Sequence, residues 1–174
     1  LKEVPVGAAH YLQVNQFDKE AHAFQFTKPT LVLDAKVEKH LLQEGDIVFA
    51  AKGTSNFCSV FHQEAGAVVA SSSFLVIRCM NLALVSPEYL CWFLNRRDSM
   101  EYLKANAIGT SIPSISKALV ESFTISIPSM RVQEMIVAIA HMQQREEQLN
   151  RKILELRNYL TERRLIEIVN KSSI

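Results

Sequence analysis

The C-terminal part of the chain carries the pattern that most restricts how this sequence can fold. Residues 129–169 predict one long helix, along which apolar side chains recur at steps of three and four, as in a coiled-coil seam. The seam positions are Met135, Ile139, Met142, Glu146, Leu149, Ile153, Leu156 and Leu160. At about 1.5 Å per residue, such a helix extends roughly 60 Å, which exceeds the width of a small domain. The helix therefore needs a packing partner outside its own domain along part of its length.

The expected partner changes along this helix. In the first turns, Val132, Ile136 and Ile139 are dense enough to pack on the chain's own domain. Beyond Leu149 the seam is narrow, which favours packing against a second helix from another copy or another repeat. The charged residues that flank the seam there are Arg151, Lys152, Glu155 and Arg157. Within the seam, the polar residue Glu146 weakens a coiled coil but can fix its register and its partner.

The preceding residues predict an α+β domain. Short apolar segments between polar turns predict strands at residues 11–14, 24–27, 31–33, 47–51, 57–61, 67–70, 74–78 and 123–127. A helix start is predicted at residues 86–88. Ser86 can cap the free backbone N–H groups, Pro87 suits the first turn, and Glu88 places a negative charge at the positive end of the helix dipole. This helix should end near residues 95–97, and a second should cover residues 99–107. The predicted fold class is α+β, with a β-rich domain with short helices over residues 1–128 and a long C-terminal coiled-coil helix in residues 129–174.

The composition indicates a buried core and no strong global charge. Hydrophobic residues make up 48% of the chain, and no stretch approaches the roughly 18 consecutive apolar residues of a transmembrane helix. The formal net charge is +1, and residues 1–128 carry 11 basic and 12 acidic residues. A DNA-binding function would therefore have to depend on local basic patches.

The cysteines indicate a reducing compartment. The chain has three cysteines, Cys58, Cys79 and Cys91. Their odd number and the lack of a C-x-x-C spacing argue against a disulfide framework and against a zinc site. The sequence also shows no basic start followed by an apolar run, so no signal peptide is predicted. We expect a soluble, cytoplasmic protein.

Several motifs occur in an order that resembles one family. The first three are LQEGDIVF at residues 42–49, ASSSFLVIR at 70–78 and PEYLCWFLN at 87–95. The closing block is more specific, and consists of GTSIPSIS at 109–116, FTISIP at 123–128 and QEMI at 133–136. In this order, and followed by a long helix, the motifs resemble a target recognition domain with its trailing helix from the DNA-specificity (S) subunits of Type I restriction–modification systems.

The resemblance has two departures. The family usually shows Pro-Pro and Glu-Gln ahead of the helix, where this chain has Pro128-Ser129 and Gln133-Glu134. A full S subunit carries two recognition domains and two such helices, whereas this chain has one of each. The chain therefore resembles a half-subunit or an excised half of a longer subunit.

The resemblance implies a function and a set of partners. It implies binding of double-stranded DNA and docking of methyltransferase (M) subunits, which bind S-adenosylmethionine and supply the chemistry, with cleavage supplied by an associated restriction subunit. The chain itself would be no enzyme and would need no cofactor. In the family the two helices run antiparallel as a spacer, which two copies of this chain could reproduce as a homodimer.

One candidate DNA contact is the loop of residues 52–56. The loop combines a cation with small polar side chains, of the types that reach phosphates and form hydrogen bonds with base edges. These candidates are Lys52, Thr54, Ser55 and Asn56. A solvated hairpin loop has the same composition. Both interpretations are open at this point.

A second candidate follows a glycine. Gly109 precedes Thr110 and Ser111, and Lys117 lies nearby in the sequence. The segment can present amides and hydroxyls to phosphate, or it can be a turn into the last predicted strand. We interpret Gly109 as structural and Thr110 and Ser111 as contacts.

A third candidate is basic. Arg96 and Arg97, with Lys104 further along, form either a phosphate-contacting patch or a solvated helix end. The sequence alone does not decide between them.

Catalysis finds little support in the sequence. Asp34 and Lys36 match the D-x-K half of a metal-dependent nuclease core, without a clear Pro-Asp partner. The histidines show no metal-ligand spacing, and no nucleotide-binding loop is present. Besides the nuclease, the rival hypothesis is a protein-interaction module with a coiled-coil scaffold helix and no DNA partner.

Overall fold

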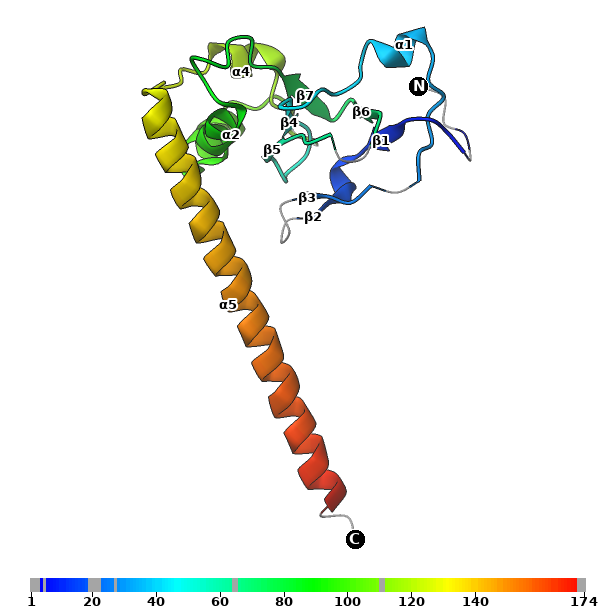
Figure 1. Ribbon diagram of the computed structural model, residues 1–174, viewed down its shortest axis with the longest axis vertical. Coiled ribbons are helices and arrows are strands. Elements are labelled where there is room, and N and C mark those ends of the chain that lie inside the picture. The colour runs from blue at the N-terminus through cyan, green and yellow to red at the C-terminus, as the bar shows by residue number, and fades with distance from the viewer. Residues whose placement is uncertain are drawn as a thin grey trace. The chain divides into compact units, whose positions relative to one another are not determined.

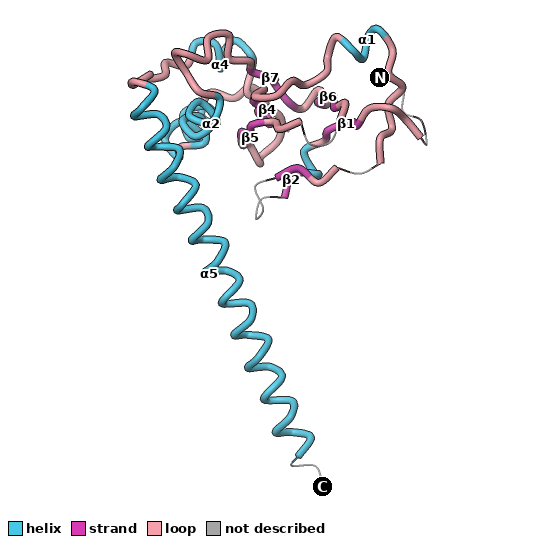
Figure 2. Tube along the Cα trace, in the orientation of Figure 1, coloured by secondary structure: helices cyan, strands magenta, loops and turns pink. Residues whose placement is uncertain are grey.

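The computed structural model of the chain describes residues 4, 6–18, 23–26, 28–63, 66–109 and 112–171. The chain divides into two compact units, Leu1–Val137 and Ala138–Ile174. The first unit holds the strands, the short helices and the first two turns of the long helix α5, and the second holds the remaining turns of α5 (Figures 1 and 2).

A three-stranded antiparallel sheet lies at the centre of the first unit. Its middle strand β4 (Ile47–Ala50) pairs with β5 (Cys58–Val60) on one side and with β7 (Phe74–Ile77) on the other. All four residues of β4 are buried, and alternate residues pack into two different core clusters. Successive side chains of a strand point to opposite faces, so both faces of β4 are covered. This explains the uninterrupted apolar run that predicted the strand.

Two smaller pairs complete the described strands. β1 (His10–Leu12) pairs in parallel with β6 (Val68–Ala70), and β2 (Phe17–Asp18) pairs antiparallel with β3 (Ala23–Phe24). A short 3-10 helix, η1 (Val14–Gln16), joins β1 to β2. Because β1 and β6 are parallel, their C-terminal ends lie at the same edge (Figure 1).

The helix α2 (Pro87–Asn95) confirms the predicted start and end. Oγ of Ser86 accepts a hydrogen bond from the backbone N–H of Tyr89 at 3.0 Å, which caps the first turn. At its C-terminal end, the side chain of Asn95 accepts from the backbone N–H of Cys58 at 2.7 Å and donates to the Cys58 carbonyl at 2.8 Å. These two bonds attach the end of α2 to β5.

The strand predicted at residues 123–127 is wrong. In the part of the chain that the structure describes, these residues form no strand ladder. Phe123 and Ile125 instead pack against the core, and the Tyr89 hydroxyl donates to the carbonyl of Ser126 at 2.6 Å. The apolar alternation there results from packing and not from sheet pairing.

Other local predictions also differ from the structure. A helix that the sequence analysis did not predict, α4 (Lys117–Ser122), precedes residues 123–127, and Oγ of Ser116 caps it by accepting from the Leu119 N–H at 3.1 Å. The helix α3 (Arg97–Ala105) begins two residues earlier than expected. Around the predicted strand at residues 31–33, an isolated bridge between Leu31 and Ala9 is present.

The long C-terminal helix is confirmed. α5 (Met130–Lys171) is a continuous helix of 42 residues, which corresponds to roughly 63 Å. The apolar seam residues between Met135 and Leu160 are each between 47% and 64% exposed. None of the described helices combines the length and apolar character needed to cross a membrane.

Candidate nucleic-acid interface

The first two candidate segments lie next to each other in the first unit. Lys52 forms an isolated β-bridge with Ser114, and the N–H of Gly53 donates to the Pro113 carbonyl at 2.9 Å. The N–H of Ile115 donates to the Ala51 carbonyl at 2.9 Å. The loop of residues 52–56 and the segment around residues 112–115 therefore form one continuous surface, although about 60 residues separate them in the sequence.

Within the loop, the side chains differ in their exposure. Lys52 and Thr54 are exposed, while Ser55 is half-buried. The side-chain amide of Asn56 donates to the Ala50 carbonyl at 2.9 Å, so this residue closes the loop. Of the four candidate DNA contacts in this loop, Lys52 and Thr54 are therefore the most accessible to solvent.

Gly109 has the structural role that the sequence suggested. Its φ is +104°, and a Cβ at this position would lie 2.8 Å from the carbonyl oxygen of Ile112. Two hydrogen bonds between the backbones of Ile108 and Ser114, at 2.9 and 2.8 Å, close this turn. The predicted contacts Thr110 and Ser111 lie outside the described residues.

Three of the basic candidates are paired with carboxylates. Arg96 donates to Asp98 at 2.6 Å, and Arg97 donates to Glu101 at 2.8 Å. The Lys117 ammonium lies 3.4 Å from Glu121. Exposed pairs of this kind contribute little to stability and can exchange partners, so phosphate binding would have to compete with them.

Arg96 also contacts aromatic rings. Its guanidinium carbon lies 5.7 Å from the centroid of Trp92 and 5.0 Å from that of Phe93. Lys104, on the following helix, is exposed. Among the described residues, Lys104 has no carboxylate partner, whereas both arginines are paired.

Sequence reasoning missed a polar groove in the same unit. It follows the ends of the parallel strands β1 and β6 and is lined by Tyr11, Gln13, Val14, Asn15, Ser71, Ser72 and Ser73. The groove has a volume of about 350 Å³. The signal in the sequence is the polar residues directly after each strand, but the parallel pairing that brings them together was not visible there.

The half-motif of a nuclease has a structural explanation. Oδ1 of Asp34 accepts from the N–H groups of Lys36 and Val37 at 2.9 and 2.8 Å, and so caps the short helix α1 (Ala35–Glu38). These two bonds lower the pKa of Asp34. Among the described residues, no group of three or more His, Cys, Asp or Glu side chains could hold a metal ion.

Two motifs of the resemblance meet in an ion pair between a buried carboxylate and a partly exposed arginine. Asp46, which is 1% exposed, accepts from Nε and Nη2 of Arg78 at 2.6 Å each and from the N–H of Gln43 at 2.8 Å. The pairing raises the pKa of Arg78. The Asp of the first motif and the Arg of the second therefore stabilise the central sheet.

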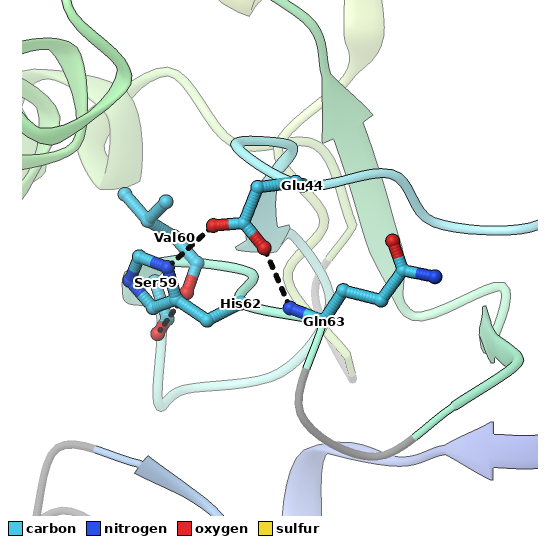
Figure 3. Close-up of polar contacts among 5 residues, drawn as sticks. All are labelled: Glu44, Ser59, Val60, His62 and Gln63. Atoms are coloured by element: carbon cyan, nitrogen blue, oxygen red, sulfur yellow. Dashed lines mark hydrogen bonds and ion pairs between the residues drawn. The ribbon is translucent and has the colours of Figure 1, made fainter.

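The neighbouring residue Glu44 fixes the end of the β5 hairpin. Figure 3 shows its carboxylate between the His62 ring and the backbone N–H of Gln63, at 2.8 and 2.6 Å. The bond from Gln63, followed by that from His62, lowers the pKa of Glu44. The polar residues Glu44 and Asp46 of this motif thus form contacts within the fold.

Gln133 joins the start of α5 to the start of α2. It is 0% exposed, and its side-chain oxygen accepts from the N–H of Ser86 at 2.9 Å. Its side-chain nitrogen donates to the carbonyls of Leu84 and Pro128, at 2.8 Å each. A buried amide with three partners fixes the first turns of α5 within the first unit.

The comparisons with known proteins agree with this architecture. The sequence profile of the Type I restriction modification DNA specificity domain matches residues 8–156. The chain belongs to this family, as the motif order predicted.

A solved structure is similar to the fold. The HsdS subunit from Thermoanaerobacter tengcongensis matches with a TM-score of 0.62 at 19% identity, over 82% of this chain and 37% of that subunit. The chain thus spans little more than a third of the HsdS subunit, and the likeness confirms the predicted fold class. Comparison with curated protein sequences gives no match.

Proposed function

We propose that this chain binds one half of a split double-stranded DNA target as the specificity component of a Type I restriction–modification system. The match of residues 8–156 to the DNA specificity family carries this proposal. The surface formed by the loop of residues 52–56 and residues 112–115 supports it, because it presents a cation beside small polar groups.

The second half of the target is bound by a second copy, joined through α5. The spacing of the seam positions, alternately four and three residues, is the same when read from Met135 to Leu160 as from Leu160 to Met135. In an antiparallel pair, each seam position can therefore face a seam position of the other helix. In that register Met135 faces Leu160, and Glu146 faces Leu149 of the other helix. A parallel pair in register would place two Glu146 carboxylates against each other, which is unfavourable in a seam. The antiparallel homodimer is therefore the assembly that we propose.

The remaining partners follow from the family. The chain docks methyltransferase subunits, which bind S-adenosylmethionine and carry out catalysis, and a restriction subunit associates with that complex. This chain has no catalytic role of its own and acts in the cytoplasm. Joining two recognition units through α5 raises the affinity for a split site, because the second contact is made at high effective concentration.

Salt-dependent DNA binding tests the proposal. The full chain, with the methyltransferase subunit present, should bind duplex DNA with an affinity that falls steeply with salt. Lys52→Gln should lower the slope of log K against log salt by about one. Lys39→Gln, at an exposed lysine after α1, is the matched control and should leave the slope unchanged.

The near balance of 11 basic and 12 acidic residues in residues 1–128 favours the rival function, a protein-interaction module with a scaffold helix. Absence of salt-dependent DNA binding in the experiment above would support this rival and overturn the DNA-binding proposal. Binding that is equal in the wild type and in Lys52→Gln would retain DNA binding but exclude Lys52 as a phosphate contact.

A further inference from the structure

The polar groove at the ends of β1 and β6 has the composition of a base-reading site. Its lining includes two carboxamides, Gln13 and Asn15, and the hydroxyls of residues 71–73. None of the residues that line it is charged. A groove that only bound phosphate would need cations or a row of amides, whereas uncharged donors and acceptors suit the edges of bases.

The backbone fixes this groove in place. The N–H of Ser71 donates to the Leu12 carbonyl at 2.9 Å, and the N–H of Phe74 donates to the Ser71 carbonyl at 3.0 Å. On the opposite wall, the N–H of Gln13 donates to the side chain of Gln16 at 2.8 Å. The backbone of both walls is therefore held next to the ends of one pair of strands before a ligand arrives.

Two side chains of the groove are available for a ligand. Asn15 and Ser72 are exposed, and within the described part of the chain their side chains form no hydrogen bond. A carboxamide carries both a donor and an acceptor, and a serine hydroxyl does as well. Asn15 and Ser72 can therefore pair with a base edge without breaking a bond inside the protein.

Backbone hydrogen bonds join one wall of the groove to the loop that carries Lys52. The N–H of Ala51 donates to the carbonyl of Ser73 at 2.9 Å, and Ala51 also accepts from the N–H of Ile115. Ala51 thus joins the groove wall, the Lys52 loop and the segment around Ile115. A lysine on a loop that is joined to an uncharged polar groove suits a division in which phosphate contacts position a duplex and polar side chains read its base edges.

We propose that this groove reads base edges of the half-site in the major groove, and that the carboxamide of Asn15 selects adenine. Asparagine and glutamine can pair with N6 and N7 of adenine together, while serine accepts either kind of base edge. The inference rests on the proposed DNA-binding function, and it assigns specificity to the groove and affinity to Lys52.

Selection of bound duplexes from a random pool, with the full chain and its Asn15→Ala and Ser72→Ala variants, tests this inference. In Asn15→Ala, the preference for A·T at one base pair should fall by about 5- to 100-fold, while the other positions keep their preferences. Ser72→Ala should weaken the preference at the same or an adjacent base pair. Gln63→Ala removes an exposed carboxamide outside the groove and is the matched control. Thermal unfolding establishes that each variant is folded.

The outcomes separate the two proposals. If the wild type enriches a motif and both groove variants enrich the same motif unchanged, the groove inference is wrong and the DNA-binding function stands. A uniform loss of affinity for all sequences in Asn15→Ala would assign the groove to the DNA backbone and likewise overturn the inference. If the wild type enriches no sequence at all, the proposed function itself fails.

Discussion

The two compact units differ in how they cover their apolar side chains. In the first unit, Phe49 and Leu103 are 0% exposed and belong to a core cluster closed by the sheet and the short helices. In the second unit, Met142, Leu149 and Ile153 are 64%, 49% and 47% exposed. A unit with its own core can fold alone, whereas a helix with an exposed apolar seam gains its stability from association. We therefore assign recognition to the first unit and assembly to the second.

The largest expected effect comes from removing most of the exposed seam. A chain that ends at Gln148 loses Leu149, Ile153, Leu156 and Leu160, and each buried side chain of this kind contributes about 1.5–3 kcal/mol. We expect the dimer dissociation constant to rise by at least about 100-fold, while the first unit keeps its far-ultraviolet circular dichroism signature. Sedimentation velocity of the full and shortened chains measures this. A shortened chain that remains dimeric would remove the seam from the interface.

The next effect concerns the joint within the first unit. Gln133→Leu leaves the N–H of Ser86 and the carbonyls of Leu84 and Pro128 without their side-chain partner. Because buried polar groups without partners are costly, the free energy of unfolding should fall by about 2–4 kcal/mol. Urea denaturation of Gln133→Leu measures this, with Gln43→Leu at an exposed position as the control. A loss no larger than that of the control would show that Gln133 does not hold α5 to α2.

A smaller effect, of opposite sign, is expected at the polar position of the seam. Glu146→Leu replaces a carboxylate by a side chain that packs well in a coiled coil, so the dimer should gain about 1–2 kcal/mol per chain and the melting temperature should rise. The same change should loosen the register, because a polar seam residue penalises shifted alignments. Differential scanning calorimetry compares it with Glu147→Leu, one position away. An unchanged melting temperature would place Glu146 outside the seam.

The smallest effect is a chemical one inside the first unit. Burial raises the pKa of Cys91 to about 12, and burial also raises the pKa of Cys58 and of the half-buried Cys79. A raised pKa keeps each thiol protonated at pH 8, so alkylation should be slow. Mass spectrometry after iodoacetamide treatment should show Cys79 modified first, and Cys58 and Cys91 only on unfolding. Early modification of Cys91 would mean that the core opens more readily than its packing indicates.

Local patterns in the sequence predicted the elements that depend on neighbouring residues. The helix α5 follows from its spacing of apolar residues, and α2 follows from Ser86 and Pro87 at its start. The central strand β4 follows from a run of apolar residues, because both of its faces are covered. The order of the motifs was sufficient to identify the family.

Contacts between residues far apart in the sequence could not be predicted from local patterns. The partners of Gln133 include Ser86, 47 positions earlier, and no spacing rule connects two such positions. The groove exists because β1 pairs with β6, and parallel pairing of distant strands leaves no local signature. At residues 123–127, alternation predicted a strand because packing against helices and pairing in a sheet leave the same pattern.

The most direct test of the central claim is selection of bound DNA by the full chain, compared with the chain that ends at Gln148. If the first unit recognises DNA and α5 holds two copies antiparallel, the full chain should enrich two inverted copies of one half-site, separated by a fixed number of unspecified base pairs. The shortened chain should enrich at most one half-site, with weaker affinity. A single contiguous motif from the full chain, or the same split motif from both chains, would contradict this assignment of recognition and assembly to the two units.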